Sequence, residues 1–186
     1  DYRLDTKLGV GPHGEVWLAT HVDGAQVRLK HAFAPPDAVR VFERIAGVES
    51  VVAGYAGGSA EDAQYEAVAQ GRTDHAEVVQ VRYRSDQVTY GTLLRVFFTS
   101  HDPTQLNRQG PDTGRQYRSA VFVADAAERA AVERYIAQLD AADVYSEPVV
   151  TTVEDLDAFY PAEDYHQDFV ADHPRHPYIV RYALPK

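Results

Sequence analysis

Residues 97–119 read Phe-Phe-Thr-Ser-His-Asp-Pro-Thr-Gln-Leu-Asn-Arg-Gln-Gly-Pro-Asp-Thr-Gly-Arg-Gln-Tyr-Arg-Ser, and they join two regions of different character. Before them, Tyr90–Thr99 has its apolar residues at helical spacing, which predicts an amphipathic helix. After them, Ser119–Ala124 has the apolar composition of a short strand. The polar segment between the two opens with His-Asp-Pro at residues 101–103, so we expect the helix to end in a turn there.

The same alternation of strands and helices continues along the chain from residue 26 onward. Strand-like runs stand at Val27–His31, Val48–Tyr55 and Glu77–Tyr83, and apolar residues at helical spacing stand at Asp37–Ile45 and Ala126–Leu139. Strands that alternate with helices predict a two-layer α/β sandwich of the α+β class.

The N-terminal segment has a different pattern from the rest. Tyr2–Leu8 and Glu15–Thr20 have strand composition, and the Asp23-Gly24 pair is a hairpin signal that leads into Ala25–His31. These residues predict a three-stranded meander. We therefore expect two units, an N-terminal β-meander at residues 1–25 and a main domain at residues 26–186.

The first 33 residues also faintly resemble the glycine-rich loop region of a protein kinase. Gly9, Gly11, Gly14 and Val16 fit the loop, and Lys30 fits the lysine of the strand that follows it. Neither a His-Arg-Asp nor an Asp-Phe-Gly motif occurs later in the sequence. Phosphoryl transfer is therefore not expected, because the base and the magnesium ligand would be missing.

Composition and charge narrow the classes of partner. The chain has 186 residues, of which 45% are hydrophobic, and its 18 Lys and Arg stand against 28 Asp and Glu for a net charge of −10. A charge of this sign argues against nucleic acid or an anionic membrane as the main partner. The sequence shows neither a membrane-length apolar run nor a signal-peptide pattern, so we expect a cytoplasmic protein.

The chain contains neither cysteine nor methionine. Without cysteine it has no disulfide, no thiol redox chemistry and no thiolate metal ligand of its own. Without an initiator methionine it can be a trimmed chain or part of a longer parent chain.

Six motifs, in order over some 150 residues, closely resemble the peptide methionine sulfoxide reductases of the A type (MsrA). The motifs are Gly54-Tyr55-Ala56-Gly57-Gly58, Tyr65-Glu66-x-Val68, His75-Ala76-Glu77-Val78-Val79, Phe98-x-x-His101-Asp102-Pro103-Thr104, the run from Asn107 to Ser119, and Phe159-Tyr160-x-Ala162-Glu163-x-Tyr165-His166-Gln167. The resemblance implies the α+β sandwich of that family, which we describe as ferredoxin-like. It also implies a pocket that binds the S epimer of methionine sulfoxide.

The nucleophilic cysteine of that family has no counterpart here. Counted without gaps from Gly47, the family's Cys-Phe-Trp positions fall on Ala34, Pro35 and Pro36. With a two-residue insertion they fall on Ala32, Phe33 and Ala34. In both registers the cysteine is replaced by alanine and the tryptophan is lost.

The resemblance leaves a cluster of acids and phenols as the candidate catalytic residues. It implies that Glu77 protonates or hydrogen-bonds the sulfoxide oxygen, that Tyr65 and Tyr117 hydrogen-bond the same oxygen, and that Asp112 orders the pocket. Each has a structural alternative, because a tyrosine can be a core residue and an Asp between glycines a turn residue. Glu77 is the hardest to explain structurally, since an unpaired carboxylate in an apolar strand is costly.

Five further positions complete the candidate ligand-binding set, which is Pro35, Pro36, His101, Tyr165 and His166. For His101 the default role is a helix C-cap or a local hydrogen bond. His166, His173 and His176, with Asp164, Asp168 and Asp172, could suggest a metal site, but the family motif already accounts for His166. We expect neither a metal nor a cofactor.

Three functions are compatible with these residues. The acid–tyrosine pocket can serve non-redox acid–base chemistry on a small molecule or peptide with a polar X=O group, with Lys30 as the only nearby amine for imine chemistry. Alternatively, the chain is a non-catalytic pseudoenzyme, a binding or regulatory module for methionine sulfoxide. A third reading keeps the family's activity, peptide methionine (S)-S-oxide reduction.

Overall fold

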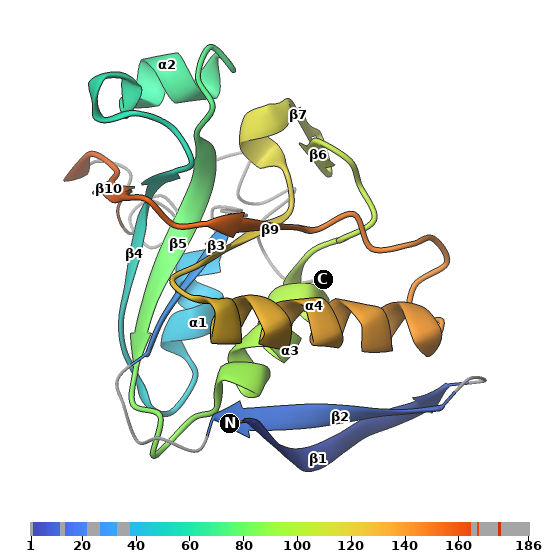
Figure 1. Cartoon of the computed structure of the whole chain (residues 1–186). Helices are drawn as coiled ribbons and strands as arrows, with labels where there is room; N and C mark the ends of the chain where they lie inside the picture. The colour runs from blue at the N-terminus through green and yellow to red at the C-terminus, as the bar shows by residue number, and fades with distance from the viewer. Residues whose placement is uncertain are drawn as a thin grey trace.

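The computed structural model describes residues 2–11, 14–21, 27–32, 38–164, 167 and 175. Its centre is a sheet of six strands in the order β10-β4-β5-β3-β8-β9 (Figure 1). All neighbouring pairs are antiparallel except β8 and β9, which are parallel. The strands are β3 (Val27–Ala32), β4 (Val48–Ala56), β5 (Ala76–Tyr83), β8 (Ala120–Val123), β9 (Thr152–Asp155) and β10 (Phe159–Pro161).

The helices begin where the sequence supplies capping residues. Thr89 accepts a hydrogen bond from the backbone N–H of Thr92 at the start of α3, and Asp125 accepts from Ala127 and Glu128 at the start of α4. The helices are α1 (Ala38–Glu43), α2 (Tyr65–Ala69), α3 (Tyr90–Ser100) and α4 (Ala126–Ala141), with 3₁₀ turns η1 (Ala60–Asp62) and η2 (Arg115–Tyr117).

Alternation along β5 divides the sheet into two faces. Val79 and Val81 point to the face covered by α1, α3 and α4, where Leu93 and Phe97 complete the main core. Val78 points to the opposite face, in a smaller cluster that includes Ala76, Ala120 and Phe122. The predicted α+β class is confirmed, with the helical layer on one face of the sheet.

The N-terminal strands form a separate hairpin. β1 (Tyr2–Gly11) and β2 (Gly14–His21) pair with each other in a two-stranded sheet, and β2 lies against α3 and α4. The expectation that a third strand continues this meander is wrong. β3 leaves the hairpin and lies between β5 and β8 in the main sheet, where its backbone pairs with a strand on each side. The expected Asp23-Gly24 turn lies outside the described residues.

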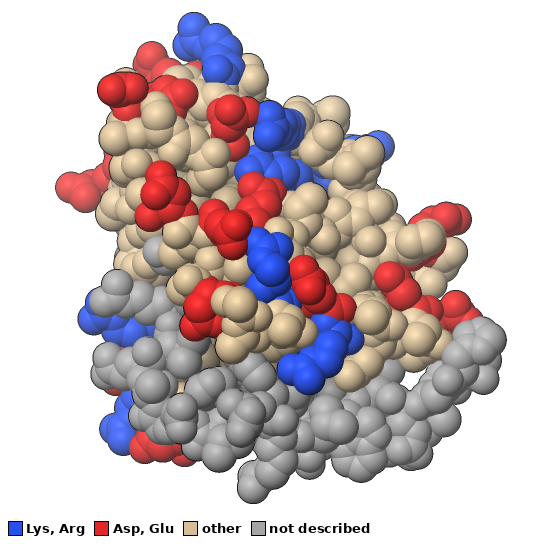
Figure 2. All heavy atoms as spheres, viewed as in Figure 1, with Lys and Arg blue, Asp and Glu red and all other residues tan. Residues whose placement is uncertain are grey.

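Side chains satisfy backbone groups at both outer regions of the main sheet. On β4, the Gln167 amide accepts from the Ala53 N–H at 3.1 Å and donates to the Ala53 carbonyl at 3.0 Å. On β9, Arg129 of α4 donates to the outward carbonyl of Val153 at 2.7 Å and to Asp155 at 2.8 Å. Figure 2 shows acidic and basic side chains interspersed on the described part of one face, without a basic stripe.

The main core predicts that truncating a buried leucine and an exposed leucine changes the free energy of unfolding by very different amounts. Leu93 is 0% exposed and Leu106 is 70% exposed. We expect Leu93→Ala to lower the free energy of unfolding by ~2–5 kcal/mol, because it leaves a cavity against the sheet. Leu106→Ala is the matched control and should change that free energy by less than ~0.5 kcal/mol. Urea titration of both variants measures the difference, and equal losses would contradict this description of the core.

Candidate functional site

Glu77 stands near the beginning of β5, at the end of the sheet where β4 and β3 flank it. Its register partner on β4 is Tyr55, and the next residue, Val78, pairs with Ala32 of β3. Alternation places Glu77 on the same face as Val79. The side chain is partly buried, and no residue of the described part of the chain hydrogen-bonds its carboxyl group. A polar group of this kind is available to a ligand.

Asp112 reaches the same site from a short ribbon. Strands β6 (Arg108–Gln109) and β7 (Asp112–Thr113) pair through a tight turn at Gly110, whose φ of 55° favours glycine. Burial, and secondly the charge of Asp112, raise the pKa of Glu77 from 4.5 to about 7. Glu77 is therefore protonated in a substantial fraction of molecules at neutral pH.

Tyr117 ends η2. Burial raises the pKa of Tyr117 to about 12, and the charges of Glu77, Asp112 and Tyr65 add to this effect. The phenol therefore stays protonated and can donate a hydrogen bond. The four residues of the predicted catalytic set therefore lie near enough to influence one another electrostatically.

Tyr65 is the first residue of α2 and is 38% exposed, so it is not a core tyrosine. Its backbone N–H donates to Glu163 Oε1 at 2.9 Å. The other carboxylate oxygen of Glu163 accepts from the hydroxyl of Tyr55 at 2.9 Å. Glu163 thereby ties the start of α2 to the strand that lies beside Glu77.

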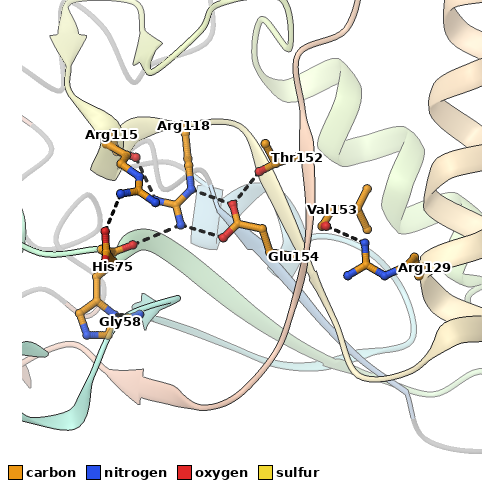
Figure 3. A network of polar contacts seen from close by, with 9 residues as sticks. Gly58, His75, Arg115, Arg118, Arg129, Thr152, Val153 and Glu154 are labelled. Atoms are coloured by element: carbon orange, nitrogen blue, oxygen red, sulfur yellow. Dashed lines mark hydrogen bonds and ion pairs between the residues drawn. The ribbon is translucent and has the colours of Figure 1, made fainter.

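A buried arginine holds η2 in place beside β5 (Figure 3). Arg118 is 6% exposed, and its guanidinium donates to both oxygens of Glu154 on β9, at 2.8 and 3.0 Å. It also donates to the carbonyls of Arg115 at 3.1 Å and Asp74 at 3.3 Å. Although burial alone would raise the pKa of Glu154, hydrogen bonds from Arg118 and Thr152 hold it below its ordinary value. The ion pair is therefore charged at neutral pH.

His75 fixes the turn that precedes η1. Its ring is 0% exposed; Nδ1 accepts from the Gly58 N–H at 3.2 Å and Nε2 lies 2.8 Å from the Ser59 carbonyl. A carbonyl can only accept, so Nε2 carries a proton, and Asp62 Oδ1 lies 3.3 Å from the same nitrogen. A Cβ at Gly58 would meet the ring at 2.5 Å, which explains glycine at this position. Gly57 beside it has a φ of 92°, in the left-handed region that favours glycine.

His101 has hydrogen-bond partners at the end of α3 and at Ser119. It is the C-cap of α3, its Nδ1 lies 2.8 Å from the Phe97 carbonyl, and its Nε2 lies 2.8 Å from Ser119 Oγ. Burial lowers the pKa of His101 to about 4, so the ring is neutral. The helix C-cap and hydrogen-bonding role expected for His101 accounts for contacts of both ring nitrogens.

Several predicted positions cannot be placed. Ala34, Pro35 and Pro36 lie outside the described residues, as do Tyr165 and His166. Ala32 is described, and it pairs with Val78 on β5 and Ala120 on β8. The register with the two-residue insertion therefore puts the lost cysteine at the end of β3, across from the residue that follows Glu77. The ungapped register puts it beyond the described strand.

A metal-binding group and a membrane-spanning helix are both absent from the described residues. No group of three His, Asp or Glu side chains is arranged there to hold a metal ion. Most of the histidines and aspartates of the suspected C-terminal metal cluster fall outside the described part. No described helix has both the length and the apolar character needed to cross a membrane.

Four residues that organise the site were not predicted from the sequence. Gln116, Arg118 and Glu163 lie inside the motifs listed above, but no role was predicted for any of them. Glu154 had no signal at all, because its partner Arg118 is 36 residues away in the chain. A buried arginine needs an acidic partner, so an arginine inside a motif is a signal that an acid lies near it in the fold.

Comparison with known proteins identifies the family of this chain. A family model described as peptide methionine sulfoxide reductase matches residues 38–185. The peptide methionine sulfoxide reductase MsrA 2 of Mesorhizobium japonicum is 52% identical over 147 residues, which cover 78% of this chain and 75% of that protein. The chain belongs to the peptide methionine sulfoxide reductase family. The family match begins at residue 38, so it does not include the positions at which the cysteine is lost.

Solved structures of two relatives have the same fold. Methionine sulfoxide reductase A of Corynebacterium diphtheriae superposes with a TM-score of 0.69 at 32% identity, covering 83% of this chain and 78% of that one. Mxr1 of Saccharomyces cerevisiae in reduced form superposes with a TM-score of 0.74 at 28% identity, covering 82% and 90%.

The raised pKa of Glu77 predicts a pH-dependent effect on stability. Its pKa is about 7 in the folded protein against 4.5 ordinarily, so the unfolded chain ionises first and the fold loses stability as the pH rises from about 4.5 to about 7. Glu77→Gln cannot ionise there. We expect the variant to gain on the order of 2 kcal/mol in free energy of unfolding relative to the parent between pH 4 and pH 8. Urea titrations at both pH values measure this gain. A difference that does not change with pH would mean that Glu77 titrates normally.

Proposed function

We propose that this chain binds the methionine S-sulfoxide group of a peptide or small molecule in the pocket formed by Glu77, Tyr65, Tyr117 and Asp112. One observation carries the proposal. Glu77 has a pKa of about 7 and no hydrogen-bond partner among the described residues. An acid that is protonated near neutral pH and lacks a protein acceptor is suited to donate to the oxygen of a ligand.

The chemistry of the ligand fits these donors. The oxygen of a sulfoxide carries partial negative charge and accepts hydrogen bonds, and protonation or hydrogen bonding of that oxygen makes the sulfur more electrophilic. Protonated Glu77 and the Tyr117 phenol both donate. Asp112, as a nearby acid, supports the protonated form of Glu77. The pocket therefore favours an X=O ligand over an anion, which two neighbouring carboxyl groups would repel.

Reduction of the sulfoxide requires a step that this chain does not provide by itself. A thiolate must attack the sulfur, and the chain has no cysteine. The relatives named above carry the name of the reductase activity. For this chain we propose that the pocket recognises and polarises the sulfoxide, and that reduction does not follow because the chain supplies no protein thiol to attack the sulfur.

A second candidate function is non-redox acid–base chemistry on a carbonyl or imine. The same protonated Glu77 favours it, because a general acid with a pKa near the working pH is most effective. Lys30 lies on β3, in register with Gln80 and Phe122, and is the amine nearest in sequence to the lost nucleophile. Turnover of such a substrate that disappears in Glu77→Gln, in a protein that stays folded, would favour this function over binding alone.

Calorimetric titration with N-acetyl-methionine S-sulfoxide amide tests the first proposal, with the R epimer as the stereochemical control. We expect the S epimer to bind at least about tenfold more tightly, which corresponds to ~1.4 kcal/mol. The affinity should fall as the pH rises through about 7, because ionised Glu77 can no longer donate. Equal affinity for both epimers, or no binding of either, would reject the proposal.

Two variants make this test specific to Glu77. Glu77→Gln keeps a donor but cannot titrate, so its affinity should be lower by about tenfold at pH 6 and independent of pH between 6 and 8. Glu66→Gln alters an exposed acid on α2 and should behave like the parent. Incubation of the parent with dithiothreitol should give no turnover above buffer. Thiol-dependent turnover would show that the chain retains a reductase function.

A further inference from the structure

The helix that carries Tyr65 is too short to be stable by itself. α2 spans Tyr65–Ala69, five residues, and the side chain of its N-cap residue, Gln64, makes no capping hydrogen bond. Isolated helices of this length do not form in water, because nucleation costs more than a single turn returns. The position of the Tyr65 phenol must therefore depend on contacts from elsewhere in the chain.

Glu163 supplies the contact at the beginning of α2. It lies 98 residues from Tyr65, and its Oε1 accepts the Tyr65 N–H at 2.9 Å. A carboxylate suits this end, where free N–H groups and the helix dipole favour negative charge. Its Oε2 is held at 2.9 Å by the hydroxyl of Tyr55, which is 3% exposed. The carboxylate is thereby anchored in the sheet.

Gln116 supplies the contact at the other end. Its Nε2 donates to the Ala69 carbonyl at 3.0 Å, and the side chain is 5% exposed. Two glycines make room for it: a Cβ at Gly71 would lie 3.1 Å from Gln116 Oε1, and a Cβ at Gly114 only 2.3 Å. Both glycines have positive φ, 66° and 145°. The backbone on both sides of the amide is therefore shaped around it.

Gln116 directly precedes Tyr117 in η2. One buried side chain thus joins the segment that carries Tyr65 to the segment that carries Tyr117. We propose that Gln116 and Glu163 are positioning residues that clamp α2 at its two ends and so fix the Tyr65 phenol relative to the Tyr117 phenol. This inference rests on the proposed function, because the clamped phenols are those that the ligand oxygen would meet.

A merely structural role predicts something different. If Gln116 only stabilises the fold, its replacement lowers stability but leaves the affinity of the folded protein unchanged. If it acts through the phenols, its effect on affinity depends on whether the phenol hydroxyl is present. A double-mutant cycle with Tyr65 separates these two cases.

The cycle uses Gln116→Leu, which keeps the volume and removes the amide, with Tyr65→Phe and the double variant. Affinity for N-acetyl-methionine S-sulfoxide amide is measured by calorimetry well below each unfolding temperature. We expect Gln116→Leu to weaken binding by about tenfold in the parent and by less than about threefold in Tyr65→Phe. The matched control is Gln70→Leu, an exposed glutamine beside Ala69, which should bind like the parent. Equal losses in both backgrounds would overturn the proposal.

Hydrogen exchange provides a readout that needs no ligand. We expect Gln116→Leu and Glu163→Ala to speed the exchange of the Tyr65 and Val68 amide protons by at least about tenfold, because α2 opens when either end is released. Glu163→Gln keeps an acceptor oxygen and should restore most of the protection. Unchanged exchange in both clamp variants would refute the clamp, whatever the ligand does. If Gln116→Leu does not fold, Glu163→Ala tests the other end in the same way.

The binding and hydrogen-exchange measurements together separate this inference from the proposed function. Absence of sulfoxide binding by the parent, together with faster exchange in the variants, would reject the function and retain the clamp on α2. Sulfoxide binding with unchanged exchange would retain the function and reject the clamp.

Discussion

The arrangement of the site depends on the buried guanidinium of Arg118. It joins three segments that are separate in the chain, namely η2, the edge strand β9 and the residues just before β5. A buried charge of this kind is costly unless it is paired and its donors are used, and here Glu154 and two backbone carbonyls meet both conditions. The planar fork of arginine binds both oxygens of a carboxylate through two parallel hydrogen bonds, a geometry that the compact ammonium of lysine does not offer. The positions of Tyr117 and Glu77 relative to each other follow from this contact.

Much of the sheet and of its helical layer could be predicted because the signals are periodic and local. Apolar spacing predicted β3, β4, β5 and β8 and the helices α1, α3 and α4, all within a few residues of their observed ends. The strands β6, β7, β9 and β10 were not predicted, since segments of two to four residues have no measurable period. The meander failed at its third strand because the Asp-Gly signal is local, whereas the pairing of β3 with β5 and β8 is not.

The predicted site residues and the supporting residues differ in how they can be recognised. Glu77, Asp112, Tyr65 and Tyr117 stand in motifs of the family, and the electrostatics of the structure couple them. Gln116 and Glu163 act on backbone atoms 47 and 98 residues away. A hydrogen bond from a side chain to a distant backbone atom leaves no constraint on the type of its partner residue, so a single sequence does not reveal it. The roles of such residues become visible only in the folded structure, where the distant segments lie side by side.

The contacts at the two ends of the sheet have a consequence for how copies of this protein behave together. Exposed strand edges are templates on which another molecule can add a strand, and proteins protect them with charges or covering groups. Here the Gln167 amide occupies both hydrogen-bonding groups of Ala53 as a neighbouring backbone would, and Arg129 occupies the outward carbonyl of Val153 beside the charge of Asp155. A strand from a second copy would have to displace these side chains before it could pair at either place. At these two places side chains therefore oppose the addition of a strand from a second copy.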